Sequence, residues 1–229
     1  MIYYQSILKL ASEKKKGLAI LIDPDKFDVS EAAAFLKRIP KETTHLFVGG
    51  STVVAQLTEG TVKALKALSN LPVILFPGDY TQITNRADAV LFLSLLSGRN
   101  PEYLVGQQVK SVAQLRISKL EIIPTAYILI DGGHESAVAR VSQTKPLSQD
   151  DLETVIHTAL AGQYMGAKLI YLEAGSGAKF SVQPMLIRAV KRVLNIPLIV
   201  GGGIRSDIQK QAAFDAGADM VVMGTVFEE

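Results

Sequence analysis

The chain of 229 residues contains no cysteine and no tryptophan. The lack of cysteine excludes disulfide bonds, thiolate metal ligands and a cysteine nucleophile. A membrane-spanning helix needs a run of roughly 18 apolar residues, and the sequence contains no such run. The N-terminal residues also lack the basic start and the small-residue cleavage site of a secretory signal. We therefore expect a cytoplasmic protein.

The charge balance is close to neutral. Lys and Arg number 24 and Asp and Glu number 22, which leaves a formal net charge of +2. A surplus this small does not indicate a nucleic-acid partner. Hydrophobic residues make up 48% of the chain, which is typical of a globular protein and not of a disordered one. No linker-like tract interrupts the sequence, so we predict one domain over residues 1–229.

Eight short apolar runs recur along the chain. They are mostly continuous and do not alternate with polar residues, as expected for parallel strands buried on both faces. The predicted strands are Leu18–Ile22, His45–Val48, Val73–Phe76, Ala89–Leu93, Glu121–Ile130, Leu169–Glu173, Leu198–Val200 and Met220–Met223.

Segments with helical spacing lie between these runs, at Val53–Leu68, Leu147–Tyr164 and Met185–Leu194. One strand in about 29 residues matches the length of a βα repeat. The alternation predicts an α/β fold, the TIM or (β/α)8 barrel, and an open doubly wound sheet remains the alternative.

Two segments depart from a regular barrel. The stretch 77–88 is short and polar, so we expect the third helix to be replaced by an irregular segment. Few residues follow the last predicted strand, and a helix around Tyr3–Ser12 could cover part of the side where a final barrel helix would pack.

Glycines gather after the last three predicted strands. Gly175 and Gly177 follow the sixth strand, Gly201–Gly203 the seventh and Gly224 the eighth. Glycine lets backbone N–H groups approach a phosphate closely, and barrels often bind phosphate near strands seven and eight. The pattern predicts a phosphate site. Tight turns without a ligand are the alternative, and isomerases, epimerases and lyases share the pattern.

Oxygen donors follow the first two predicted strands. Asp23 ends the first strand and Ser51 follows the second. A carboxylate and a hydroxyl suit Mg²⁺ if a substrate diphosphate supplies further ligands. Capping of the next helix by Ser51 or Thr52 remains equally open.

Together these motifs resemble the geranylgeranylglyceryl phosphate synthase family and its bacterial relatives. The resemblance covers Ile20 to Thr225 in order and is most specific at Tyr171–Gly177. It implies an Mg²⁺-dependent modified TIM barrel that transfers a prenyl group, with geranylgeranyl expected, from its diphosphate to the sn-3 hydroxyl of sn-glycerol 1-phosphate. The product is an ether lipid precursor.

The resemblance also assigns site residues. Asp23 and Ser51 match the metal positions. The positions that match the glycerol phosphate site are Tyr171, Leu172, Glu173, Ala174, Gly175, Ser176, Gly177, Gly202, Gly203, Gly224 and Thr225.

General chemistry agrees with these roles. Glu173 ends a strand beside the phosphate loop, where it could accept the proton of the attacking hydroxyl, and Tyr171 could orient the glycerol. Mg²⁺ at Asp23 would neutralise the departing diphosphate. A prenyl chain needs an apolar groove, for which Tyr103 and Tyr127 are candidates, although each is as readily explained by core packing.

Other readings remain open. Some bacterial relatives carry Lys where this chain has Leu21, so another group could contact substrate here. A sugar-phosphate isomerase or lyase and a non-catalytic phosphate-binding protein are the alternative functions. The resemblance also implies a homo-oligomer, a dimer or hexamer, that buries faces such as Tyr103–Val112. The lipid product suggests transient membrane contact.

Overall fold

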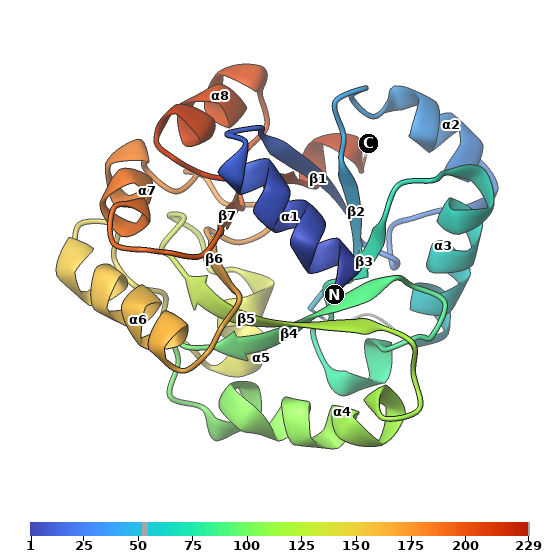
Figure 1. Ribbon diagram of the computed structural model, residues 1–229, viewed down its shortest axis with the longest axis horizontal. Coiled ribbons are helices and arrows are strands. Elements are labelled where there is room, and N and C mark those ends of the chain that lie inside the picture. Colours follow the sequence, from blue (N-terminus) through green and yellow to red (C-terminus); the bar gives the residue numbers. More distant parts are fainter. Residues whose placement is uncertain (52–54, 229) are drawn as a thin grey trace.

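The computed structural model describes residues 1–51 and 55–228, and its centre is a closed barrel of eight parallel strands. Each strand pairs with its neighbour in the sequence, and β8 pairs with β1 (Figure 1). This closure confirms the barrel and excludes the open doubly wound sheet. The strands are β1 (Gly17–Ile22), β2 (His45–Val48), β3 (Val73–Leu75), β4 (Ala89–Leu95), β5 (Glu121–Leu129), β6 (Leu169–Glu173), β7 (Leu198–Gly201) and β8 (Met220–Met223).

The continuous apolar runs arise because both faces of the barrel are buried. Side chains alternate between the two faces of a strand. Leu169 and Tyr171 of β6 face the barrel interior, whereas Ile170 and Leu172 pack in the outer core beneath the helices. Glu173 is the next residue of β6 that faces the interior, so its carboxylate lies at the mouth of the barrel.

Helices surround the barrel (Figure 1). The predicted helix Leu147–Tyr164 begins late, at Leu152, because the Asp151 carboxylate accepts a hydrogen bond of 3.1 Å from the Thr154 N–H and caps it. Thr52 and residues 53–54 lie outside the described residues. The helices are α1 (Ile2–Ser12), α2 (Ala32–Arg38), α3 (Ala55–Leu68), α4 (Gln107–Leu115), α5 (Ala137–Ser142), α6 (Leu152–Tyr164), α7 (Pro184–Lys191) and α8 (Asp207–Asp215).

The stretch 77–88 contains no α-helix, as predicted. Its one regular turn is the 3₁₀ segment η2 (Tyr80–Gln82), which Asp79 caps. The Tyr80 N–H donates to Gln107 Oε1 of α4 at 3.0 Å. The irregular segment therefore lies against the start of α4 and leaves the barrel wall at β3 and β4 without a covering helix of its own.

Helix α1 crosses one end of the barrel (Figure 1). The Tyr3 and Tyr4 N–H groups donate to the Glu121 carboxylate, at 2.9 and 2.7 Å, where β5 begins. Acidic groups are favourable at helix N-termini. The helix thus closes the end at which strands begin, and the expectation that it packs where a final barrel helix would lie is wrong. The 3₁₀ turn η4 (Thr225–Phe227) follows β8 instead.

The structure contains no helix of the length and apolarity that crossing a bilayer requires, within residues 1–51 and 55–228.

Candidate active site

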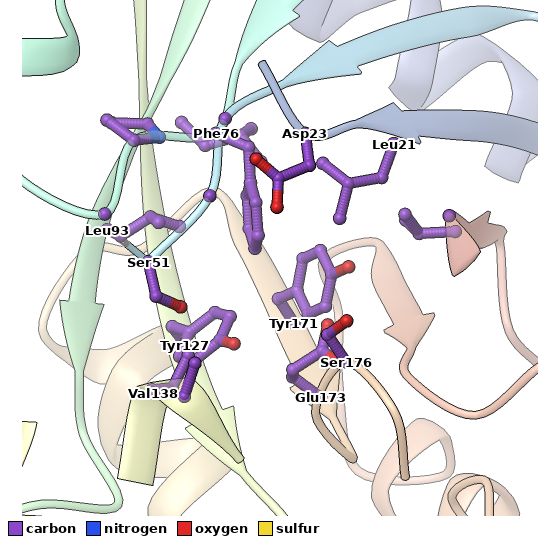
Figure 2. Close-up of a pocket in the computed structure, with 18 of the residues that line it drawn as sticks. Leu21, Asp23, Ser51, Phe76, Leu93, Tyr127, Val138, Tyr171, Glu173 and Ser176 are labelled. Carbon is purple, nitrogen blue, oxygen red and sulfur yellow. The ribbon is translucent and has the colours of Figure 1, made fainter. Parts of the chain in front are cut away.

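A cavity of about 350 Å³ lies at the carboxyl ends of the strands. Figure 2 shows several of its side chains converging from opposite walls. The cavity brings together most of the predicted site residues, although their loops are far apart in the sequence. Those that line it are Asp23, Ser51, Tyr103, Tyr127, Tyr171, Glu173, Ser176, Gly202, Gly203, Gly224 and Thr225.

Glu173 combines burial with a near-neutral pKa. Its side chain closes β6 and the residue is 5% exposed. Burial penalises the carboxylate and raises the pKa of Glu173 from 4.5 to about 7, against a hydrogen bond of 2.7 Å from the Gly175 N–H to Oε1. A carboxyl group with this pKa can take up and release a proton near neutral pH, as general base catalysis requires.

Tyr171 lies two residues earlier on the same inward face. The side chain is fully buried, and its hydroxyl lies beside the Glu173 carboxylate but forms no well-directed hydrogen bond within the described part of the chain. Burial and the nearby charge of Glu173 raise the pKa of Tyr171 well above its ordinary value, so it stays a hydroxyl. A buried hydroxyl without a partner is costly. Its position against the cavity suits a polar group of a ligand.

An aromatic floor surrounds that hydroxyl. The Phe76 ring stacks on Tyr171 with centroids 5.3 Å apart and meets Tyr127 at 5.8 Å. The Tyr127 and Tyr171 rings are 5.4 Å apart. Sequence reasoning missed Phe76, which it assigned to the end of a buried strand. Strand β3 instead ends at Leu75, and the phenyl ring turns toward the cavity (Figure 2).

The cavity also has an apolar wall, which includes the predicted groove candidate Tyr103 and two residues that the sequence did not reveal. Leu93 of β4 and Val138 of α5 contribute to it (Figure 2). Tyr103 joins them from a single π-helical turn, η3 (Glu102–Gly106), a form that often occurs at functional sites. This wall adjoins the irregular segment between β3 and β4. Because residues 77–88 form no α-helix there, the cavity has room for an elongated apolar group.

The loop after β7 packs closely on the carboxylate. Gly202 has φ +81°, and a Cβ there would lie 2.3 Å from Glu173 Oε1 and 2.5 Å from the Gly175 nitrogen. A side chain at this position is therefore excluded. The loop is thus a tight turn that also lines the cavity, and neither the phosphate site nor the alternative of a turn without a ligand is tested by this geometry.

Four of the predicted glycerol phosphate residues do not line the cavity. Leu172 points into the outer core, and Ala174 is buried while its N–H donates to the Gly201 carbonyl at 3.0 Å. The Gly175 N–H is taken by Glu173, and Gly177 lies beside His134, which is exposed on its loop. Strand alternation turns the Leu172 side chain away from the cavity, and the assignment of Leu172 to the glycerol phosphate site stays a prediction.

Asp23 and Ser51 supply hard oxygen atoms to one cavity. Burial raises the pKa of Asp23, so the carboxylate lacks a full complement of favourable partners. No cluster of three or more His, Asp or Glu residues suited to a metal occurs in the described ranges. The donor set fits Mg²⁺, which commonly takes one or two protein ligands and completes its shell with water and phosphate oxygens.

Gln82 holds the loop that carries Ser51. It is 1% exposed, accepts a hydrogen bond of 3.0 Å from the Gly78 N–H and donates to the Gly50 carbonyl at 2.9 Å. The irregular segment is thereby fastened to the loop after β2. Sequence reasoning missed this residue, because a glutamine in a polar stretch gives no sign of burial.

These features define a (β/α)8 barrel with a partly polar, partly apolar cavity at the carboxyl ends of its strands. A buried carboxylate, glycine loops and oxygen donors meet an apolar wall in one cavity, an arrangement that suits a prenyltransferase, which joins a polar phosphate to an apolar chain.

The chain belongs to the PcrB family, which matches residues 10–229. It is 56% identical to the geranylgeranylglyceryl phosphate synthase of Zunongwangia profunda, over 97% of this chain and 95% of that protein. Identity to the enzyme of that name from Thermococcus kodakarensis is 45%, over 95% and 86% of the two chains. The crystal structure of (S)-3-O-geranylgeranylglyceryl phosphate synthase from Thermoplasma acidophilum, in complex with sn-glycerol-1-phosphate, superposes with a TM-score of 0.91 at 38% identity, covering 99% and 91%. The protein is accordingly an enzyme of the prenyltransferase class.

Proposed function

We propose that this enzyme transfers a prenyl group, geranylgeranyl by preference, from its diphosphate to the sn-3 hydroxyl of sn-glycerol 1-phosphate, with Mg²⁺ as cofactor. The observation that carries the proposal is the position of Glu173. Its carboxylate, with a pKa of about 7, lies where the glycine loops meet the apolar wall of the cavity. The names and the bound substrate of the similar enzymes support the same reaction.

In the proposed reaction Glu173 accepts the proton of the sn-3 hydroxyl. The hydroxyl oxygen forms a bond to C1 of the prenyl group as the bond from C1 to the diphosphate breaks, and the diphosphate leaves with the bonding electrons. The Tyr171 hydroxyl donates a hydrogen bond to the glycerol, and the loops with Ser176, Gly203 and Thr225 bind its phosphate. Magnesium held by Asp23 and Ser51 would neutralise charge on the leaving diphosphate.

Tyr103 and Tyr127 would border the prenyl chain, Tyr127 near the reacting carbon and Tyr103 farther along the apolar wall. Their positions in the cavity support this assignment. The apolar wall favours the transferase over the sugar-phosphate isomerase or lyase. A sugar phosphate is polar and would not need an apolar surface of this extent.

We also propose a homo-oligomer, a dimer or hexamer, in the cytoplasm, with transient membrane contact for product release. Helix α4 and the preceding turn leave Val105, Val109 and Val112 exposed at helical spacing. This apolar stripe supports burial against a second copy.

The test is a turnover assay with labelled sn-glycerol 1-phosphate and prenyl diphosphates of increasing length, with and without Mg²⁺. A labelled product that passes into butanol only with Mg²⁺ supports the proposal, and the best donor identifies the chain length. The enantiomer sn-glycerol 3-phosphate is the matched control. Binding of glycerol phosphate without product from any donor would refute the transferase assignment.

A further inference from the structure

The cavity has few positive charges for a site that takes two phosphate-bearing substrates. Its described lining includes four acidic side chains and only two basic ones. The acidic residues are Asp23, Asp79, Glu173 and Glu228, and the basic residues are Lys26 and Arg205. Apart from the proposed Mg²⁺, phosphate oxyanions at this rim would therefore find few positive groups among the described side chains.

Lys26 lies between the two loops where the proposed function places phosphate. It follows β1 by four residues, and its Nζ is 3.9 Å from Asp23 Oδ2. The same Nζ donates to Glu228 Oε2 at 2.8 Å. Glu228 comes just after η4 and the glycine loop of β8, so the ammonium group bridges the proposed metal side and the proposed glycerol phosphate side.

The pair of Lys26 with Glu228 is suited to exchange. The Lys26 side chain is 50% exposed and that of Glu228 is 19% exposed. Ion pairs in contact with water contribute little to stability, about 0–1 kcal/mol, so breaking this pair costs little. An ammonium group has three donors and can bind a more highly charged phosphate while it stays near Asp23.

We propose that Lys26 binds a phosphate oxyanion of the substrates at the cavity rim, and that Glu228 is its resting counter-ion, which the phosphate displaces. The inference rests on the proposed function and adds a binding residue to it. The oxyanion could belong to the prenyl diphosphate or to sn-glycerol 1-phosphate, and the experiment separates the two.

The test measures calorimetric binding of two probes, inorganic diphosphate with Mg²⁺ and sn-glycerol 1-phosphate alone. Lys26→Met should weaken one or both by roughly tenfold to a hundredfold, the value of a charge-assisted hydrogen bond. Loss for diphosphate only assigns Lys26 to the donor, and loss for glycerol phosphate only assigns it to the acceptor. Glu228→Gln should bind the affected probe as tightly as the wild type or more tightly, because the competing carboxylate is gone.

Lys63→Met is the matched control. Lys63 is 54% exposed at the side chain and pairs with Glu59 on α3 at 2.6 Å, away from the cavity lining. This variant should bind both probes as the wild type does. Unchanged binding of both probes by Lys26→Met would overturn the inference. So would equal weakening by Glu228→Gln, since the pair would then serve only to hold the two loops together. Failure of the transferase itself shows separately, as wild-type protein that binds the probes and forms no product.

Discussion

Replacing Glu173 by Gln should make the protein more stable while it removes catalysis. The substitution keeps the shape of the side chain and an oxygen that can still accept the Gly175 N–H bond of 2.7 Å. It removes the charge that the barrel mouth solvates poorly. The variant therefore separates the cost of holding a buried carboxylate from its use as a base.

The magnitude follows from the pKa. A rise in the pKa of Glu173 from 4.5 to about 7 corresponds, at about 1.4 kcal/mol for each pH unit, to about 3 kcal/mol. Between these values the folded state keeps a proton that the unfolded state releases, so the contribution of Glu173 to stability falls as pH rises through this window. Above pH 7 the full penalty is present, and below pH 4.5 it is absent.

Urea unfolding of both proteins at pH values on either side of this window tests the reasoning. Glu173→Gln should match the wild type at the lowest pH and exceed it by about 3 kcal/mol at pH 8. Glu135→Gln, on an exposed loop, is the control and should show no such divergence. The reasoning is refuted if the free energies of unfolding of the two proteins differ by less than about 1 kcal/mol at every pH. It is also refuted if the wild type becomes more stable relative to the variant as pH rises.

The same pKa predicts the pH dependence of catalysis. As a base Glu173 must be ionised, so kcat/KM of the wild type should fall about tenfold for each pH unit below about 7 and level off above it. In Glu173→Gln, kcat/KM should be lower by roughly a hundredfold or more, and it should no longer fall as pH decreases below about 7. A wild-type profile that stays flat between pH 5 and 8 would remove Glu173 from the role of base.

Three further substitutions follow from the geometry. Gly202→Ala places a Cβ 2.3 Å from Glu173 Oε1, so we expect a loss of about 1–3 kcal/mol in urea unfolding together with reduced turnover. Gln82→Leu leaves two buried backbone groups unpaired, which should cost about 2–4 kcal/mol and raise the Mg²⁺ concentration needed for half-maximal turnover by loosening Ser51. Asp23→Asn should abolish Mg²⁺-dependent turnover without lowering the melting temperature, because burial already disfavours that carboxylate.

The barrel could be predicted because most of its strands are buried on both faces. Apolar side chains toward the interior and toward the helices produce uninterrupted runs, and β2, β6 and β8 have the predicted limits. The start of α6 could not be predicted from periodicity. Leu147 forms a bridge with Ile130 at the end of β5, and that contact between distant residues competes with the helix.

The site was predictable where it depends on strand ends. Asp23, Ser51 and Glu173 line one cavity because the carboxyl ends of parallel strands lie at one end of a barrel. Phe76 and Gln82 were not predictable in this way. Their positions depend on the path of the irregular segment. Contacts with the loop after β2 and with α4 determine that path, and no local sequence pattern encodes it.

The motif Tyr171–Gly177 shows why a continuous sequence signature is not a continuous binding surface. Tyr171 and Glu173 face the cavity because they share the inward phase of β6, and Leu172 between them stabilises the outer core. Gly175 then turns the chain so that its N–H reaches back to the carboxylate. One short segment thus carries a buried carboxylate, the packing beneath it and the donor that moderates its pKa. Substitutions at neighbouring positions should consequently change different properties: rate at Glu173, stability at Leu172, and both at Gly175.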